Sequence, residues 1–431
     1  MASPRRGRAP AVADALIIAG APIEDREFAG WMAPLGPFEP SPALAVAVSG
    51  GADSLCLALL ADRWARARGG RVLALIVDHG LRAASADEAM QTAVWLASQE
   101  IAVSVLTLDD LKPGTGMAAR ARSARFDVLE AACGNVGIVH LLLGHHAADQ
   151  AETVLIRVLG QSGGDGMAAM APVVEFLTVR VLRPLLGQPP ARLRETLRAA
   201  GTSWIEDPSN SDAAALRPRL RLLRRDSEGA GSATAFLTEA AAAAATRRRT
   251  REIACAAFMA AHVTLRPQGF AILPDGPVPT DVLRALARMV SGSRYPPSHA
   301  LVGELAKHPR PATFAGVRLM RWRSRMILLR EARAMAPPRA AVAGVVWDGR
   351  FKLLGSVAVG MEIGALGGDS RAFRRCSDLP AAVLATLPAL RGKDREIIAP
   401  HLGKAGLCIG EPVKVAWYPP NPAAGAWFSG D

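Results

Sequence analysis

The sequence predicts an α/β protein with a doubly wound, mostly parallel sheet, followed by a helical, arginine-rich domain and a small C-terminal domain with β content. Two observations support this prediction. From residue 43 onward, short apolar or β-branched runs alternate with helical stretches long enough to cross over between parallel strands. In addition, unusual polar residues fall where the predicted strands end, and open α/β sheets bind their ligands at that edge.

The predicted elements follow one another as βα units. Strands are expected at residues 43–49, 72–78, 103–108 and 138–144, with helices at 54–68, 85–100, 117–133 and 149–159. After about residue 185, arginine-rich helices are expected at 190–200 and 216–225, helical sequence continues to about residue 310, and strands follow at 317–322 and 326–329.

These patterns predict four segments along the chain. They are a mobile N-terminal extension (1–40), the α/β domain (41–215), a helical, basic region (216–335) and a small C-terminal domain (336–431). The last boundary rests on Ala336-Pro337-Pro338, a sequence typical of a linker.

The charge of the chain is unevenly distributed. The net charge is +12, and residues 180–251 contain fourteen arginines, no lysine and seven acids. Because the planar fork of arginine binds phosphate oxygens in a bidentate way, this cluster favours a nucleic-acid backbone as partner. The other interpretation is that arginine simply replaces lysine in a sequence rich in Ala, Gly and Pro.

The sequence shows no sign of a membrane or a disulfide framework. No run approaches the roughly 18 consecutive apolar residues that a membrane span needs. The five cysteines include no C-x-x-C pair, so neither disulfides nor a structural zinc site are predicted. We therefore expect a soluble, cytoplasmic protein without membrane partners, and a homodimer is one possible assembly.

A glycine-rich turn follows the first predicted strand. Ser49-Gly50-Gly51-Ala52-Asp53-Ser54 leads into an apolar helix. Two consecutive glycines let backbone N–H groups approach an anion, and the helix N-terminus adds partial positive charge. The two serines can add hydroxyl donors, and Asp53 can face a metal ion or the substrate. A Walker loop would supply a lysine; this loop has none, so a different phosphate chemistry is predicted.

The turn resembles the S-G-G-x-D-S loop of the PP-loop ATP pyrophosphatases, where it holds the pyrophosphate part of ATP. The resemblance implies that residues Ser49 to Ser54 bind ATP, and that Mg²⁺ arrives with ATP, with Asp53 and Asp149 as candidate ligands. Other stretches are similar, in order and spacing, to one member family, the tRNA(Ile)-lysidine synthases. They are Val77–Arg82, Ala121–Phe126, Gly144–Thr153, Arg183–Leu186, Trp204–Asn210 and Arg217–Arg221.

The sequence departs from the family pattern at two positions. The family usually has two consecutive acids before Gln-Ala-Glu-Thr, and this chain has Ala148-Asp149. The glutamate commonly found just ahead of the Ala-Arg-x-Ala-Arg segment is Ala118 here. The first departure leaves Asp149 to act with Glu152 alone.

The resemblance implies that L-lysine is joined to C2 of the wobble cytidine of tRNA(Ile) with a CAU anticodon, with ATP converted to AMP and pyrophosphate. The C2 oxygen of cytosine is a poor leaving group, and adenylation turns it into AMP. The ε-amine of lysine, whose pKa is about 10.4, must lose its proton before it attacks C2. A nearby carboxylate can hold the ammonium and accept that proton.

Three acids are the catalytic candidates: Asp53, Asp149 and Glu152. Asp149 and Glu152 are three residues apart at the start of a predicted helix, hence on one face of it. We expect these two to bind the lysine ammonium or Mg²⁺. N-terminal helix capping is the alternative interpretation, because acids stabilise that turn in any protein.

Further candidates for nucleotide or substrate contact lie at strand ends. Asp78 and His79 close the second strand, although both also suit an ordinary turn. His145 closes the fourth strand beside His146, and orientation of a phosphate or simple packing is favoured over zinc because no cysteine is close in sequence.

Downstream, Arg217, Arg219 and Arg221 alternate along the chain. We expect them to contact the tRNA backbone or the triphosphate. A solvated charged face is the alternative for this cluster.

Three other functions compete with this prediction. A PP-loop tRNA thiolase would normally require paired cysteines or an iron–sulfur site, and a small-molecule PP-loop synthetase would not need the basic region. An RNA-binding protein with an inactive loop is disfavoured by the intact acids Asp53, Asp149 and Glu152.

Overall fold

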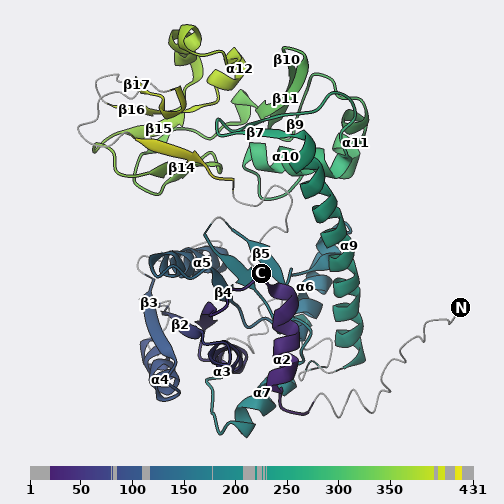
Figure 1. Cartoon of the computed structure of the whole chain (residues 1–431), viewed down its shortest axis with the longest axis vertical. Coiled ribbons are helices and arrows are strands. Elements are labelled where there is room, and N and C mark those ends of the chain that lie inside the picture. The colour runs from purple at the N-terminus through teal and green to yellow at the C-terminus, as the bar shows by residue number, and fades with distance from the viewer. Residues whose placement is uncertain are drawn as a thin grey trace, which may run out of the picture. The chain divides into compact units, whose positions relative to one another are not determined.

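The computed structural model describes residues 20–78, 80, 85–108, 117–176, 178–206, 219–220, 226, 229, 231–392, 397–402 and 413–419. It divides into two compact units, with the division between Arg248 and Arg249 (Figure 1). The boundaries predicted at residues 40, 215 and 335 remain predictions. The two units are described separately below.

The N-terminal unit is built on a six-stranded sheet with the order β3-β2-β1-β4-β6-β5. All neighbouring strands are parallel except β5, which pairs antiparallel with β6. The doubly wound, mostly parallel sheet is thereby confirmed. The strands are β1 (Ala43–Val48), β2 (Arg71–Asp78), β3 (Ala102–Thr107), β4 (His140–Leu142), β5 (Val173–Glu175) and β6 (Arg180–Leu182).

Helices connect these strands where the sequence predicts them. α3 and α4 share one hydrophobic core with β1 and β2, and Figure 1 shows α5 on the opposite side of the strands. The helices are α3 (Ala52–Arg66), α4 (Ser85–Ser98), α5 (Met117–Asn135), α6 (Ala147–Leu159) and α7 (Pro190–Ala199), with short η2 (Gly166–Ala168).

Part of the predicted N-terminal extension belongs to this core. Residues 25–35 form α2 (Asp25–Met32) and η1 (Ala33–Leu35). The side chains of Phe28 and Met32 are buried against the core around α3. The proline- and arginine-rich start of the chain gave no hint of this, because an eight-residue helix carries only two turns of pattern.

The strand order fixes where a ligand can bind. From β1 the chain moves outward to β2 and β3, and then returns to β4 on the other side of β1. The carboxyl ends of β1 and β4 are therefore neighbours at the topological switch point, where open α/β sheets hold their ligands. The glycine-rich turn follows β1, and Gly144 to His146 follow β4.

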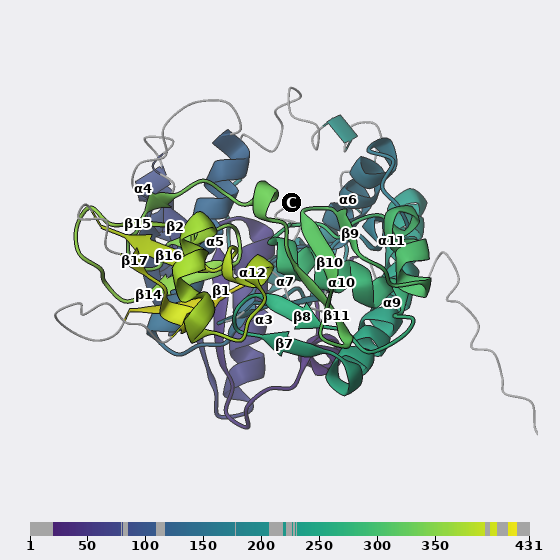
Figure 2. The ribbon, with the colours of Figure 1, turned by 90° about the horizontal axis from the view of Figure 1, so that it is seen from above.

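The C-terminal unit is built on a five-stranded antiparallel sheet with the order β7-β8-β11-β10-β9. Helices α10 and α11 cover one face, and α12 with η5 covers the other; Figure 2 shows β10 between α10 and α12. Helix α9 (Ser232–His262) runs across the division at residue 248 into this unit. The other elements are β7 (Thr264–Arg266), β8 (Phe270–Ile272), α10 (Thr280–Ser291), α11 (His299–Lys307), β9 (Ala312–Phe314), β10 (Val317–Trp322), β11 (Arg325–Arg330), η5 (Gly367–Cys376) and α12 (Ala381–Leu384).

Two small antiparallel sheets complete this unit and confirm the predicted C-terminal β content. Their orders are β12-β15-β16-β17 and β13-β14-β18. The elements are η4 (Ala332–Ala334), β12 (Arg339–Ala340), β13 (Val346–Trp347), β14 (Phe351–Leu354), β15 (Glu362–Ala365), β16 (Pro388–Arg391), β17 (Ile397–Ile398), η6 (Pro400–Leu402) and β18 (Lys414–Trp417). In the part of the chain described here, no helix is both long and apolar enough to cross a membrane.

A buried ion cluster joins the two sides of the linker predicted at residues 336–338. Asp348 accepts hydrogen bonds from Arg330 of β11 at 3.0 Å from each of Nε and Nη2, and from Arg350 Nε at 2.8 Å. Arg350 is fully buried and also donates to the carbonyl oxygens of Gly269 and Thr386. The residues before and after the linker therefore share one interior.

Candidate functional site

The glycine-rich turn forms a closed loop at the end of β1. Gly50 has a φ of +82°, and Gly51 is the N-cap of α3. The hydroxyl of buried Ser54 accepts a hydrogen bond from the Ser49 amide at 3.1 Å and donates to the Gly51 carbonyl at 3.0 Å. The side chain of Ser54 therefore holds the loop in shape, and the start of α3 adds its positive dipole end.

Three neighbouring segments lie close to this loop. The amide of Ile205 donates to the Gly50 carbonyl at 3.0 Å, and a Cβ on Gly50 would lie 2.7 Å from Thr92 Oγ1. A Cβ on Gly144 would lie 3.1 Å from the carbonyl oxygen of Asp53. Backbone without side chains at both glycines is thus what lets the loop sit between its neighbours.

His146 connects two of the predicted catalytic acids. Its Nε2 lies 3.3 Å from Oδ2 of Asp53, and its Nδ1 lies 3.4 Å from Oδ2 of Asp149. The Asp149 carboxylate also accepts the His146 amide at 3.0 Å and so caps α6. The structure brings Asp53 and Asp149 together through a histidine whose role the sequence left open, and it shows the capping contact expected under the alternative interpretation.

The two acids of α6, Asp149 and Glu152, are less accessible to solvent than Asp53 of α3. Glu152 is fully buried, while Asp149 retains 9% exposure and Asp53 has a side chain that is 39% exposed. Beside them, the amide side chain of Gln150 exchanges two hydrogen bonds with the backbone of Met170 at 3.0 and 2.9 Å. Asp53 is consequently the acid with most room for a ligand, and Glu152 lies deepest.

Asp78 forms the turn contacts that its position at a strand end suggests. Its Oδ1 accepts the Gly80 amide at 2.9 Å and the Ser85 hydroxyl at 2.6 Å. These bonds fit the turn interpretation and join the end of β2 to the start of α4. His79 lies outside the described residues, so its predicted contact remains a prediction.

His145 accepts a hydrogen bond from Arg183, a residue that the sequence analysis included only in the stretch Arg183–Leu186. Arg183 is 2% exposed, and its Nε donates to Nδ1 of His145 at 3.2 Å, while Nη1 donates to the Ala171 carbonyl at 2.9 Å. Arg183 directly follows β6, which pairs with β4. His145 and Arg183 therefore meet at the same edge of the sheet as the glycine-rich turn.

Ala148, which replaces the first of two consecutive acids, faces a packed environment. A Cβ on Gly229 would lie 3.2 Å from the Ala148 Cβ and 2.6 Å from Pro190 Cδ. Thr238 of α9 also donates to the Ala147 carbonyl at 3.3 Å. The methyl side chain at 148 thus belongs to the contact between α6 and the segment that leads into α9.

Only part of the predicted arginine cluster can be placed. Arg219 is described and exposed, whereas Arg217 and Arg221 lie outside the described residues. At the second departure, Ala118, the structure places the backbone in the first turn of α5. The predicted contacts of these three arginines remain predictions.

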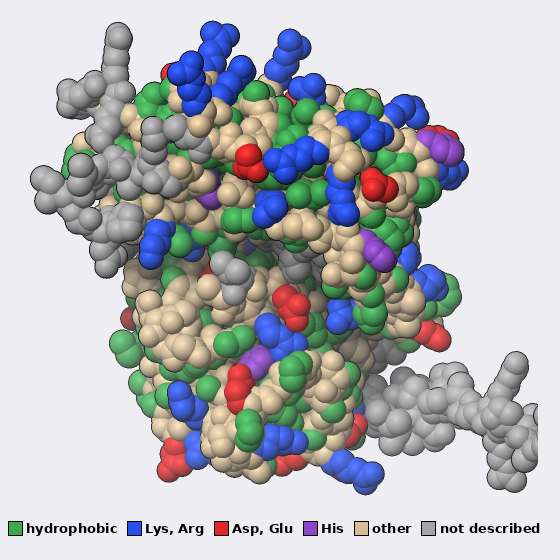
Figure 3. All heavy atoms as spheres, turned by 45° about the horizontal axis from the view of Figure 1, so that its top comes forward, with side chains coloured by type: hydrophobic (Ala, Val, Ile, Leu, Met, Phe, Trp, Pro, Cys, Tyr) green, Lys and Arg blue, Asp and Glu red, His purple; other side chains and the backbone are tan. Residues whose placement is uncertain are grey.

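The two units differ in net charge, which the sequence did not reveal because it did not show where the units divide. Residues 249–427 contain 25 lysines and arginines against 12 acids, whereas residues 1–248 contain 26 of each. The excess positive charge of the chain therefore lies entirely in the C-terminal unit. Figure 3 shows many lysine and arginine side chains over one face of that unit, with few acids between them.

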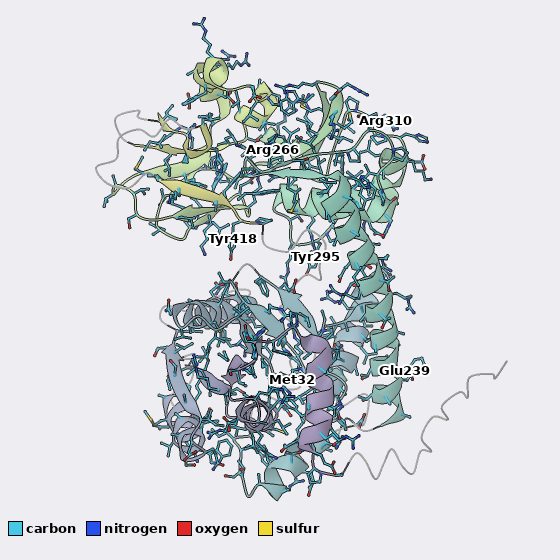
Figure 4. The ribbon with its side chains drawn as sticks, in the orientation of Figure 1. Met32, Glu239, Arg266, Tyr295, Arg310 and Tyr418 are labelled. Atoms are coloured by element: carbon cyan, nitrogen blue, oxygen red, sulfur yellow. The ribbon has the colours of Figure 1, made fainter. Side chains whose placement is uncertain are left out.

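Both tyrosines of the chain belong to this unit as well. The Arg294 guanidinium lies 5.5 Å from the Tyr295 ring centre, and Lys352 Nζ lies 4.8 Å from the Tyr418 ring centre. In Figure 4 the two tyrosines project from the same edge of the unit. Each ring thus has a cation beside it. The sequence did not reveal these pairs, because the members of the second pair, Lys352 and Tyr418, are far apart along the chain.

The side chains around the glycine-rich turn limit which metal ion could bind there. Among the residues that the structure describes, no group of three or more His, Cys, Asp or Glu side chains is placed to hold a metal ion. Mg²⁺ prefers oxygen ligands and usually binds through one or two carboxylates together with substrate phosphates. The partly exposed Asp53 fits that arrangement.

The chain is similar in sequence to known PP-loop proteins. The model of the PP-loop domain family matches residues 24–225. A tRNA(Ile)-lysidine synthase of Bradyrhizobium sp. is 45% identical over 189 residues, which cover 43% of this chain and 53% of that protein. The chain thus matches about half the length of this relative.

Two other relatives align over nearly their whole length. The tRNA(Ile)-lysidine synthase of Ruegeria pomeroyi is 32% identical over 384 residues, covering 85% of this chain and 90% of that protein. That of Ralstonia nicotianae is 33% identical over 439 residues, covering 88% and 93%. The similarity therefore extends through both units.

Proposed function

Because the chain belongs to the tRNA(Ile)-lysidine synthase family, we propose that it ligates L-lysine to C2 of the wobble cytidine in tRNA(Ile) with a CAU anticodon. ATP is cleaved to AMP and pyrophosphate through an adenylated cytidine. One observation carries the proposal: the lysine-free glycine loop and the acids Asp53 and Asp149 meet around His146 at the switch point of the sheet.

The loop suits pyrophosphate release. We propose that the turn from Ser49 to Ser54 binds the phosphates through the backbone around Gly50 and Gly51, and that Asp53, whose side chain is 39% exposed, contacts the Mg²⁺ that accompanies them. Mg²⁺ supplies charge neutralisation on the phosphate oxygens. The N-terminal unit carries no excess charge, so local dipoles and this metal, not a field of the whole unit, favour the nucleotide.

The acids of α6 are suited to the step that follows adenylation, in which the lysine amine attacks C2 of the cytidine. The lysine ε-ammonium must be held and deprotonated before it attacks C2, and carboxylates serve both purposes. We propose that Asp149 and Glu152 provide them. A buried carboxylate such as Glu152 needs a compensating charge or hydrogen bonds, and a bound ammonium is one source of that compensation.

Replacing Glu152 by Gln tests this assignment. Loss of one charge-assisted hydrogen bond, worth about 1.5–3 kcal/mol, should raise the KM for lysine by about tenfold to a hundredfold, with the KM for ATP little changed. Steady-state kinetics against each substrate measure both constants. Glu195→Gln on α7, where the acid forms a surface ion pair with Arg198, is the matched control. Unchanged lysine KM and kcat in Glu152→Gln would reject the assignment.

We propose that the tRNA docks chiefly on the C-terminal unit, and that Arg217, Arg219 and Arg221 of the N-terminal unit also contact the tRNA backbone. The excess of 25 basic over 12 acidic residues in 249–427 supports this, because phosphate contacts supply most of the affinity for nucleic acid. Tyr295 and Tyr418, each beside a cation, offer rings on which an unstacked base can lie.

Salt provides the test of this docking. If four or more phosphates are neutralised, log K should fall against log salt with a slope of about −3 or steeper. Filter binding or anisotropy with tRNA between about 50 and 200 mM salt measures the slope. Combined alanine replacement of Arg371, Arg374 and Arg375, which are exposed on η5, should make it shallower. A flat response in the unaltered protein would contradict docking by charge.

The reaction class is tested by where ATP is cut. With α-labelled ATP, we expect AMP as the labelled product, formed only when both tRNA(Ile) and lysine are present. Labelled ADP would indicate a different phosphate chemistry. AMP formation that needs a sulfur donor in place of lysine would support the thiolase, and AMP formation without RNA would support a small-molecule synthetase.

A further inference from the structure

A buried arginine donates a hydrogen bond to a histidine at the edge of the sheet that carries the glycine-rich turn. Arg183 is 2% exposed, follows β6 directly, and donates from Nε to Nδ1 of His145 at 3.2 Å. Its Nη1 donates to the Ala171 carbonyl at 2.9 Å, and its backbone amide donates to the Pro172 carbonyl at 2.9 Å. The guanidinium is thus fixed in place from both its main chain and its side chain.

The chemistry of the two groups permits one arrangement of protons. Arginine remains protonated in proteins and has no acceptor, so Nδ1 of His145 must accept and carries no proton. A neutral imidazole then has its proton on Nε2. Protonation of Nδ1 would break the hydrogen bond and place a second positive charge beside the first, which burial of Arg183 makes unfavourable.

We infer that Arg183 is a positioning residue that holds His145 as the neutral Nε2–H tautomer, so that His145 donates a hydrogen bond to a phosphate oxygen of ATP and does not act as a base. This rests on the proposed function. Gly144, the preceding residue, packs against the backbone of Asp53, and the following His146 contacts the Asp53 side chain. His145, partly exposed between them, stands next to the phosphate loop. A donor fixed in advance is the form in which a protein stabilises charge on a transferring group.

The tautomer is measurable without substrate. In the full-length protein labelled with ¹⁵N-histidine, the His145 signals are identified by their loss in His145→Gln. We expect Nε2 to be protonated and Nδ1 to be an acceptor at neutral pH, and His145 to stay neutral at pH 6, below the usual histidine pKa of about 6.5. Protonated Nδ1, or an imidazolium, in the unaltered protein would overturn the inference.

Variants add a readout that a purely structural role would not move. In Arg183→Met, His145 should titrate with an ordinary histidine pKa and kcat should fall about tenfold or more, whereas Arg183→Lys should recover part of both properties. His145→Gln should keep the acid limb of the pH–rate profile, because a group that does not titrate cannot cause it. If that limb disappears in His145→Gln, His145 acts as a base and the inference is wrong.

These results separate the inference from the proposed function. The NMR measurement depends on Arg183 and His145 alone. A fixed Nε2–H tautomer in a protein that fails to transfer lysine would refute the proposed function and leave the inference standing. If Arg183→Met does not fold, the spectrum of the unaltered protein and of Arg183→Lys decides.

Discussion

Replacing Asp348 by Ala is expected to destabilise the C-terminal unit by about 3–5 kcal/mol, the range found when one member of a buried ion cluster is removed. The side chain of Asp348 is 2% exposed and that of Arg350 is fully buried. Both Arg330 and Arg350 direct guanidinium groups at this carboxylate. Burial lowers the pKa of Arg350 to about 10, so the guanidinium remains charged at neutral pH, and the variant would leave it buried without its carboxylate.

The pH dependence follows from the same contacts. Burial raises the pKa of Asp348, but hydrogen bonds and charge from Arg330 and Arg350 outweigh burial and hold the pKa below its ordinary value. A lowered folded pKa means that the stabilisation is fully present above about pH 4, the ordinary carboxyl range, and is lost as the pH falls through the folded pKa.

Urea unfolding of the full chain measures the loss, with hydrogen exchange in β11 and β14 assigning the transition to this unit. Asp378→Ala is the matched control, because Asp378 pairs with Arg323 on the surface with both side chains more than half exposed, and such pairs contribute little. Equal unfolding midpoints for Asp348→Ala and Asp378→Ala would show that the cluster does not hold the unit together.

Replacing Gly50 by Ala is expected to lower ATP turnover by about a hundredfold or more, the size of effect that a shift of 1 Å at a reacting group produces. With a φ of +82°, an alanine at this position would be strained, and its Cβ would lie 2.7 Å from Thr92 Oγ1 and 3.0 Å from Ile205 Cδ1. The loop would have to move, and the backbone N–H groups that we propose as phosphate donors would move with it.

The adjacent glycine supplies the control. Gly51 has an ordinary φ of −73°, and a Cβ there would meet its nearest atom, Ser49 Oγ, at 3.6 Å, which is normal contact. The thermal unfolding midpoint should therefore fall less in Gly51→Ala than in Gly50→Ala. Isothermal titration with ATP and turnover assays complete the comparison. Normal ATP affinity and turnover in Gly50→Ala would contradict the role assigned to the loop.

The sequence predicted the frame of the N-terminal unit because its elements are long enough to show a period. The six-residue run Ala43–Val48 and the helix Ala52–Arg66 each carry a clear pattern around the glycine turn. The three-residue strands β4, β5 and β6 do not, and only β4 was expected, from the apolar run that contains it. In the same way, strands β7 and β8 between α9 and α10 were hidden in a region predicted as helical.

The site was predicted in outline, and its side-chain geometry was not. The sequence put Asp53, Asp149 and Glu152 at one edge of the sheet, because parallel strands end at a common edge. It could not show that His146 lies between two of these acids, or that Arg183 reaches His145 across 38 residues of chain. Such contacts depend on how β4 and β6 pair, and no local pattern encodes them.

We propose that this protein attaches lysine to a cytidine of tRNA. Its most direct test is mass spectrometry of nucleosides from tRNA(Ile) with a CAU anticodon after incubation with the full-length protein, ATP and L-lysine. We predict that the wobble cytidine gains the mass of one lysine less one water, and that omission of ATP or lysine abolishes the product. An unmodified cytidine under conditions in which ATP is cleaved to AMP, or a sulfur-containing product in its place, would contradict the proposed activity.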